Sequence, residues 1–461
     1  MDLNCLMNTA GEDGETERGQ GSVHMIWFIR TIVYVLMAGL RRSLRVAAVL
    51  YALAGHALLP APVRADEVRP RFELLHLWAT SEEAYALRAV SDPVRASGVD
   101  WSESWVTTNF LGVREQFAQR LALGVPPSGL FWLGGDEAED LFEQKLFRLF
   151  PNRVGERAFS DELIPEIYQR VREGDSIRLL PVGIHLQNRM LYNGDVLRRL
   201  GLAMPESWQD LLNIAPTLRK NGVHAVVFSD QRWQMRFFIT SIMAEQFTFE
   251  DMREFLAGTG SAGKYEPQLR RSIEIFLALR PYASPLSRDL NWANVVEHVA
   301  SGGSFAAFLG DFVAPILRRY PAVHCAAAPG NDYVIWSFDA IALVTTEDPA
   351  VIAGQDRLIE TVIKPEVRHE YILRKGGIPA YRGSDIRQMD ACSQASMESW
   401  KMADIKVLLT ASQWLQTLDI AASILRPAWW DPDAEAATTT TDLITAIDLM
   451  NQRDGPAPAD R

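Results

Sequence analysis

The stretch that decides the fold class is Arg71-Phe-Glu-Leu-Leu-His-Leu-Trp78, followed by Thr80-Ser-Glu-Glu83. The first segment is a short, mostly apolar run, which predicts a buried strand. The second predicts a helix start, because a hydroxyl can cap free N–H groups and carboxylates suit the positive end of the helix dipole. A strand that leads directly into a helix is the first unit of an α/β protein.

The same alternation continues along the chain. Ser128–Leu133 predicts a short buried strand, and Ser207–Arg219 predicts a helix that Ser207 caps. Strand candidates follow at His224–Phe228, Ser304–Leu309 and Asp332–Leu343. Helices and strands that alternate at this spacing predict an α/β fold with largely parallel sheets.

The N-terminal region has the layout of a secretory signal peptide. Three arginines between residues 41 and 45 precede the apolar run Val46–Leu59, and Val63-Arg-Ala65 fits a small-x-small cleavage site before Asp66. Residues 1–65 are therefore predicted to be removed, with Met37 as an alternative start. The competing interpretation is an N-terminal membrane anchor, but the apolar run is short for a span. We expect the mature chain to fold in the periplasm.

Composition restricts the function. Removing residues 1–65 leaves roughly 400 residues, enough for two domains. The net charge of −12 argues against a nucleic-acid partner. The 13 tryptophans are a high count, and Trp is suited to stacking against the flat faces of ligands.

Enzyme and cofactor motifs are lacking. Gly258-Thr-Gly-Ser-Ala-Gly263 matches a dinucleotide-binding pattern, but it follows a predicted helix rather than a strand. A helix end with a loop explains it better. The sequence contains no P-loop, nucleophile elbow, HExxH or CxxC motif, so we expect no enzyme activity, no cofactor and no metal site.

The mature chain keeps two cysteines, Cys325 and Cys392. They either pair or lie buried as separate thiols. An oxidising compartment favours the disulfide.

Several short blocks match one known family, in order from Leu74 to about Ser412. The blocks are Leu75-His-Leu-Trp78, Ala122-Leu-Gly-Val-Pro-Pro127, Leu180-Pro-Val-Gly-Ile-His-Leu-Gln-Asn188, Pro205-Glu-Ser-Trp208, Ser304-Phe-Ala-Ala-Phe-Leu-Gly-Asp-Phe312, Gly376-Gly-Ile-Pro-Ala380 and Met389-Asp-Ala-Cys392. On these blocks the chain resembles the family 1 extracellular solute-binding proteins of ABC sugar importers, especially the glucose/mannose-type branch.

The resemblance implies a type II-like periplasmic-binding fold, with a ligand cleft between two lobes that crossing segments join. It implies a carbohydrate-like ligand, the permease subunits of an importer as partner, a monomer, and pairing of the two cysteines. The expected divisions are a signal region 1–65, an N-lobe from 66–180 and 296–338, a C-lobe from 181–295 and 339–455, and a tail 456–461.

The resemblance also implies a set of ligand-binding residues: stacking tryptophans, hydroxyl-binding charged groups, and hinge or cleft residues. They are Trp78, Trp292, Glu82, Asp339, Lys375, His185, Asn188 and Trp233. Five of them also have a plainer interpretation. Trp78 fits a core position, Glu82 a helix-dipole partner and His185 a hinge strand, while Asp339 and Lys375 fit exposed positions.

The chain departs from the glucose-type pattern at several positions. Phe131 and Leu133 replace a polar Gln and His, Phe312 replaces a Trp, Leu77 replaces the first of two tryptophans, and Gly183 replaces an Asn. An unpaired buried sugar hydroxyl costs about 1–3 kcal/mol. Glucose therefore does not follow as the ligand, and a less hydroxylated, larger or more apolar solute fits better.

Three other functions remain open from the sequence. A ligand-loaded protein could engage a membrane sensor or a redox system instead of a permease. An exported hydrolase could use a carboxylate pair such as Glu82 and Asp339, and a scaffold would bind no small ligand.

Mass spectrometry of the exported protein tests the signal-peptide prediction. We expect a mature N-terminus at Asp66, and Ala65→Phe should block cleavage because the site needs a small residue. A mature chain that keeps residues 37–65 would contradict the prediction and support the anchor.

Overall fold

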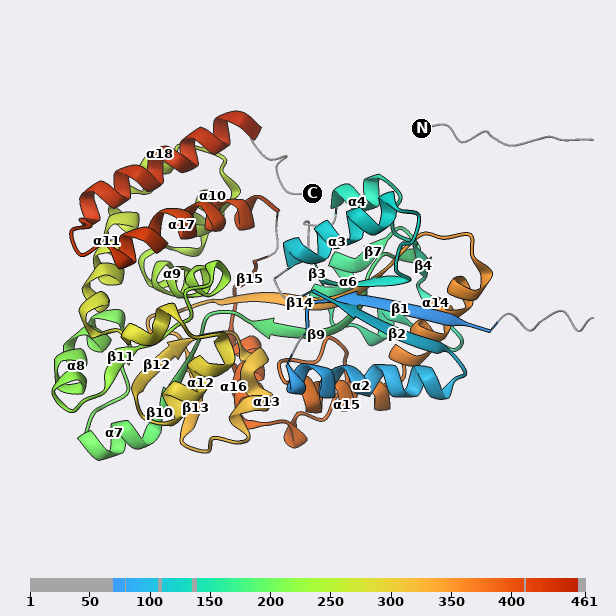
Figure 1. Cartoon of the computed structure of the whole chain (residues 1–461), viewed down its shortest axis with the longest axis horizontal. Helices are drawn as coiled ribbons and strands as arrows, with labels where there is room; N and C mark the ends of the chain where they lie inside the picture. Colours follow the sequence, from blue (N-terminus) through green and yellow to red (C-terminus); the bar gives the residue numbers. More distant parts are fainter. Residues whose placement is uncertain (1–68, 79, 107–109, 135–138, 410–411, 455–461) are drawn as a thin grey trace, which may run out of the picture. The chain divides into compact units, whose positions relative to one another are not determined.

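The computed structural model describes residues 69–454 apart from 79, 107–109, 135–138 and 410–411. The signal region 1–65 and the tail 456–461 lie outside the described residues. The described chain forms two α/β lobes, each built around its own sheet and core (Figure 1).

The first lobe is built on a mixed sheet of six strands. The strands are β1 (Arg71–His76), β2 (Asp100–Trp105), β3 (Gly129–Gly134), β9 (Leu180–Leu186), β14 (Val334–Leu343) and β15 (Lys406–Leu408). β1 pairs in parallel with β2 and β3, whereas β14 runs antiparallel to both β3 and β9. All ten residues of β14 are buried, so this strand forms the centre of the first core.

The helices of the first lobe cover this sheet. They are α2 (Ser81–Ala96), α3 (Phe110–Ala122), α4 (Glu139–Glu143), α5 (Phe159–Glu162), α6 (Pro165–Val171), α14 (Pro349–Val362), α15 (Pro365–Lys375) and α16 (Ala391–Met402). Short strands add two small sheets. One contains β4 (Phe150–Pro151), β8 (Ser176–Ile177) and β7 (Arg172–Glu173), and the other contains β5 (Arg153–Val154) and β6 (Arg157–Ala158).

The second lobe is built on four strands in the order β11 (His224–Val226), β12 (Ser304–Phe308), β10 (Arg189–Asn193) and β13 (Val323–Ala327). Its helices are α7 (Gly194–Leu200), α8 (Trp208–Lys220), α9 (Arg232–Gln246), α10 (Phe249–Ala257), α11 (Glu266–Leu279), α12 (Trp292–Ala300), α13 (Ala314–Leu317), α17 (Ser412–Trp430) and α18 (Ala436–Asp454). Single 3₁₀ turns include the one at Asp311–Val313.

The local signals in the sequence place the helix ends as expected. Thr80 caps α2 in a reciprocal arrangement with Glu83, and Ser207 caps α8 in the same way. Gly258 ends α10 in the left-handed conformation, so the helix-end interpretation of the glycine pattern is confirmed.

The chain passes between the lobes three times, after β9, after β13 and after β15. The passages are hydrogen-bonded to one another: Gln187 N donates to Ile335 O at 2.7 Å, and Leu409 N donates to Trp336 O at 2.8 Å. Asn188 adds a side-chain tie, because its Oδ1 accepts from Ile335 N and its Nδ2 donates to Tyr333 O. We call residues 186–189, 331–336 and 408–409 the hinge.

Two expectations about the fold are corrected. The sheets are mixed rather than largely parallel, because β14 enters the first sheet antiparallel and β10 pairs antiparallel with β12 and β13. The expected lobe ranges also differ from the strand pairing. Residues 304–327 complete the sheet of β10 in the second lobe, and residues 334–408 return to the first lobe.

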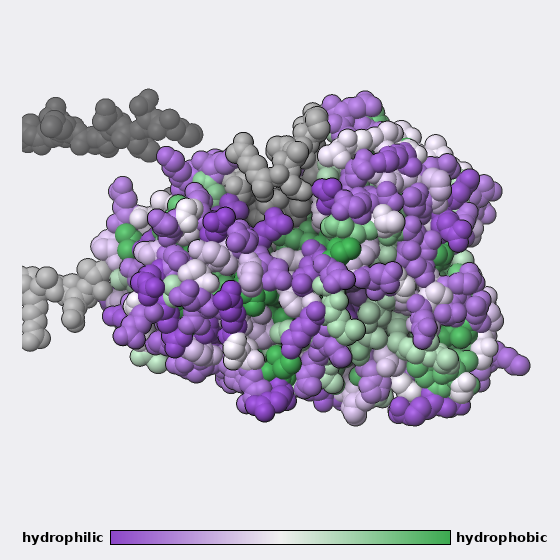
Figure 2. Space-filling model, turned by 180° about the vertical axis from the view of Figure 1, so that it is seen from behind, coloured by the Kyte–Doolittle hydropathy of each residue, from purple (hydrophilic) through white to green (hydrophobic). Residues whose placement is uncertain are grey.

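The surface is mostly hydrophilic in the rear view, with apolar patches scattered across it (Figure 2). Within the described ranges, no helix combines the length and the apolar composition that crossing a bilayer requires.

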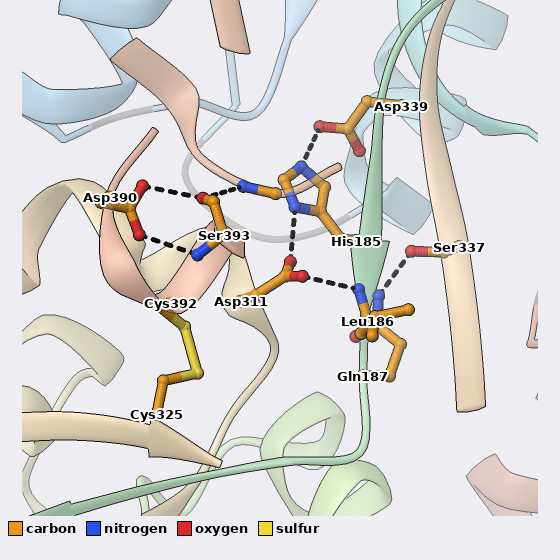
Figure 3. A network of polar contacts seen from close by, with 11 residues as sticks. His185, Leu186, Gln187, Asp311, Cys325, Ser337, Asp339, Asp390, Cys392 and Ser393 are labelled. Atoms are coloured by element: carbon orange, nitrogen blue, oxygen red, sulfur yellow. Dashed lines mark hydrogen bonds and ion pairs between the residues drawn. A yellow bond between two sulfur atoms is a disulfide. The ribbon is translucent and has the colours of Figure 1, made fainter. Parts of the chain in front are cut away.

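A disulfide joins Cys325 on β13 to Cys392 at the start of α16 (Figure 3). Cys325 packs with the second-lobe core, whereas α16 anchors in the first-lobe core through Trp400. The predicted bridge is therefore present, and it links the two lobes beside the hinge.

Loss of this disulfide should destabilise the protein. Closing a separation of 67 residues is worth about 4 kcal/mol in the chain-entropy model, so the Cys325→Ser/Cys392→Ser double variant should lose about that free energy of unfolding. Denaturant unfolding with and without reductant measures the loss. Reductant should lower the stability of the wild type and leave the double variant unchanged; an equal response of both proteins would contradict the prediction.

Candidate functional site

A buried histidine lies between two carboxylates at the hinge. His185, near the end of β9, is 3% exposed, with Nδ1 at 3.0 Å from Asp311 Oδ1 and Nε2 at 3.1 Å from Asp339 Oδ2 (Figure 3). Asp339 lies on β14 of the first lobe, and Asp311 begins the 3₁₀ turn after β12 of the second lobe. Asp311 also accepts a hydrogen bond from Leu186 N at 3.2 Å. His185 therefore connects the two lobes.

The geometry favours a proton on both ring nitrogens when both carboxyl groups are ionised. A neutral imidazole has one N–H, so one of its two contacts would set a lone pair against a carboxylate oxygen. Burial and Lys375 lower the pKa of His185, but Asp339 and Asp311 outweigh them and raise it above its ordinary value of 6.5. The two carboxylates therefore favour the charged, doubly protonated form of His185.

The Gly376-Gly377 pair allows the chain to pass close to this histidine. Both glycines have positive φ, and a Cβ on Gly377 would lie 2.5 Å from Ile184 O and 2.6 Å from the His185 ring. The chain then pairs Ile378 with Ile184 through two backbone hydrogen bonds. This close approach explains the Gly-Gly-Ile-Pro block.

Four half-buried aromatic rings gather next to this network on the second lobe. We call Trp233, Phe237, Trp292 and Phe312 the aromatic wall. Phe312 is its centre, with ring centroids at 6.0 Å from Trp233, 6.2 Å from Phe237 and 5.7 Å from Trp292. These rings come from α9, α12 and the turn after β12, so they converge from three elements.

Lys375 and His185 both lie against the same ring. Lys375 ends α15 of the first lobe, is 4% exposed, and places Nζ 5.6 Å from the centroid of Phe312. The His185 ring lies edge-on to Phe312 at 6.3 Å. The structure thus brings five of the predicted residues together: His185, Asp339, Lys375, Trp233 and Trp292.

The other three predicted residues have different surroundings. Trp78 is 6% exposed and packs in the first-lobe core, 4.0 Å from the Phe131 ring and 6.2 Å from Tyr371. Glu82 pairs with Arg319 of the second lobe, so it links the lobes rather than serving only the helix dipole. Asn188 uses both its side-chain oxygen and its side-chain nitrogen in hydrogen bonds within the hinge.

Sequence reasoning missed Asp311, Phe237 and Tyr371 as site residues. Asp311 lies in the family-like block Ser304–Phe312, directly before Phe312. That position is the sequence signal that could have identified it. Phe237 and Tyr371 follow ordinary helical spacing and carry no separate signal.

Within residues 69–454 as described, no group of three His, Cys, Asp or Glu side chains is arranged to hold a metal ion.

The chain is similar to proteins named as sugar-binding. A "Probable sugar-binding periplasmic protein" of Brucella suis biovar 1 (strain 1330) is 21% identical over 367 residues, which cover 76% of this chain and 85% of that one. A protein of the same name from Rhizobium meliloti (strain 1021) is 21% identical over 376 residues, covering 78% and 87%. No protein-family model matches the chain.

Solved structures share the fold. The bacterial solute receptor AcbH, described as having an exclusive preference for β-D-galactopyranose, superposes with a TM-score of 0.70 at 11% identity, covering 84% of this chain and 99% of its own. A Listeria monocytogenes ABC substrate-binding protein in complex with cycloalternan gives 0.64 at 14% identity, covering 84% and 100%. The predicted two-lobed α/β class and the resemblance to sugar solute-binding proteins are confirmed; the glucose/mannose branch stays a prediction.

The charge on His185 should appear in the pH dependence of stability. Because its folded-state pKa is raised, its contribution is fully present below about pH 6.5 and is lost as pH rises through the folded-state value. Removing one partner of a buried ionic network costs about 3 kcal/mol, so His185→Gln should lose roughly that at pH 6 and less at higher pH. Chemical denaturation across pH 5.5–9 measures both effects.

His369→Gln is the matched control, since His369 lies on α15 and is only partly buried. It should keep the wild-type pH profile. A His185→Gln profile parallel to the wild type would contradict the charged-bridge interpretation.

Proposed function

We propose that the protein captures a carbohydrate-like solute between its two lobes and delivers it to the membrane subunits of an ABC importer. The observation that carries the proposal is the aromatic wall of the second lobe facing Lys375 and the His185 network. Sugar recognition needs this combination, because aromatic rings take the apolar C–H faces while charged groups bind hydroxyls.

The site residues have separate roles in this proposal. Trp233, Trp292 and Phe312 stack against the ligand, and Lys375 and Asp339 bind its polar groups. His185 and Asn188 position the two lobes at the hinge. Trp78 packs against Phe131 in the first-lobe core, and the Glu82–Arg319 pair stabilises contact between the lobes.

Hinge motion would couple the ligand to the transporter. A ligand that contacts both lobes stabilises the arrangement in which they lie close together, since only there are all its contacts made. The relatives named as periplasmic sugar-binding proteins support an exported chain. In this proposal the exported chain acts as a monomer beside a permease.

A carboxylate-pair hydrolase is not supported. Glu82 pairs with Arg319, and Asp339 is bonded to His185. Hydrolysis needs one carboxyl that gives up a proton to the leaving group, and neither acid is placed as a free donor.

A ligand screen on the mature chain from Asp66 tests the proposal. We expect one or more sugars, glycosides or polyols to raise the melting temperature by several degrees, since ligand at 100 times its Kd adds about 2.7 kcal/mol. A well-folded protein that responds to no member of a broad panel would overturn the proposal in favour of a scaffold role.

The Trp292→Ala variant tests whether the aromatic wall is the ligand-binding site. The variant should lose the ligand-induced fluorescence change and at least about tenfold in affinity, because stacking on an aromatic ring contributes on the order of 1 kcal/mol or more. Trp430→Ala is the control, since Trp430 is a partly buried second-lobe tryptophan at the end of α17, beside Arg288 rather than the wall. Unchanged affinity in Trp292→Ala would remove the wall from the site.

A further inference from the structure

The buried charges at the hinge do not balance. The positive groups are Arg189, His185 and Lys375, and the negative groups are Asp311 and Asp339. His185 carries its charge because both ring nitrogens face carboxylate oxygens. Three buried cations thus meet two buried carboxylates, which leaves one positive charge in excess.

The excess charge is located at Lys375. Both carboxylates are already engaged by His185, and Asp311 also attracts Arg189 and binds Leu186 N. Glu83, an acid that acts electrostatically on Tyr371 near the site, has its carboxylate hydrogen-bonded to Thr80. Among the described residues, Lys375 Nζ has no hydrogen bond or ion pair, and it lies over the ring of Phe312 at 5.6 Å from the centroid.

A second unpaired donor lies on the same helix face. Tyr371 precedes Lys375 by four residues on α15, so the two side chains share one side of the helix. Within the described part of the chain, the buried Tyr371 hydroxyl also lacks a hydrogen-bond partner. Buried polar groups are normally paired, so two such groups on one helix face indicate a ligand that accepts hydrogen bonds there.

We propose that the ligand is a sugar acid: a carbohydrate with one carboxylate, which binds Lys375 while the sugar ring stacks on the aromatic wall. This deepens the proposed function and rests on it. A neutral sugar would leave the excess positive charge buried, whereas one carboxylate neutralises it. A charge-assisted hydrogen bond to a buried ammonium is also about twice as strong as a neutral one.

The experiment compares acids with their uncharged isosteres. Isothermal titration calorimetry would use D-galacturonate and D-glucuronate, their methyl esters, and the parent hexoses, on the wild-type mature chain. We expect at least one acid to bind about tenfold or more tightly than its own ester and parent sugar. The ester keeps the ring, the hydroxyls and nearly the size of the acid, so the difference reports the charge.

Other outcomes separate the two proposals. If an ester or a parent hexose binds as tightly as the acid, the sugar-acid inference is wrong and the sugar-binding proposal stands. If none of the six compounds binds and the broader neutral panel also fails, both proposals are wrong.

Substitution of Lys375 tests the location of the charge. Lys375→Gln should remove the preference for acid over ester, so that the two affinities lie within about twofold of each other. Lys401→Gln, an exposed lysine on α16, is the matched control and should keep the preference. A preference that survives in Lys375→Gln would overturn the assignment.

The unliganded variants supply an independent readout. Because Lys375 has no ion-pair partner among the described residues, Lys375→Met should melt at or above the wild-type temperature. A large drop in melting temperature would mean that Lys375 balances the buried carboxylates, and it would overturn the charge argument.

Discussion

The bridge from Asp311 through His185 to Asp339 is the interaction on which the arrangement of the lobes depends. Each lobe has its own sheet and its own core. The chain crosses between them through narrow segments whose backbone groups bind one another. His185 between two carboxylates constrains how the lobes are oriented, because its two ring nitrogens fix the position of one acid in each lobe.

Local signals in the sequence predicted much of the fold. The strand before Thr80, the capped helices at Thr80 and Ser207, and the glycine end at Gly258 all depend on neighbouring residues. The lobe ranges and strand directions depend on distant pairing. Nothing near Val334 indicates that β14 lies between β3 and β9, or that β12 and β13 complete the sheet of β10.

The residues of the candidate site were largely predictable from the sequence, but their contacts were not. The resemblance supplied Trp292, Lys375, Asp339 and His185, and the structure brings them together around Phe312. It did not supply their chemistry: the double contact of His185 and the missing partner of Lys375 follow only from three-dimensional placement. The apolar substitutions at Phe131 and Phe312 have visible roles, since one packs against Trp78 and the other is the centre of the wall.

The position of β14 has a consequence for how the protein reaches its native state. β14 lies between β3 and β9, yet it is synthesised about 150 residues after β9. The first half of the first lobe therefore has an incomplete core when it leaves the ribosome. The strands of the second-lobe sheet, all within residues 189–327, can pair before that core closes. Neither lobe is complete until late in synthesis, because β14 and β15 complete the first sheet and α17 and α18 complete the second core. The edges of β3 and β9 therefore stay open to pairing with other chains until β14 has been made.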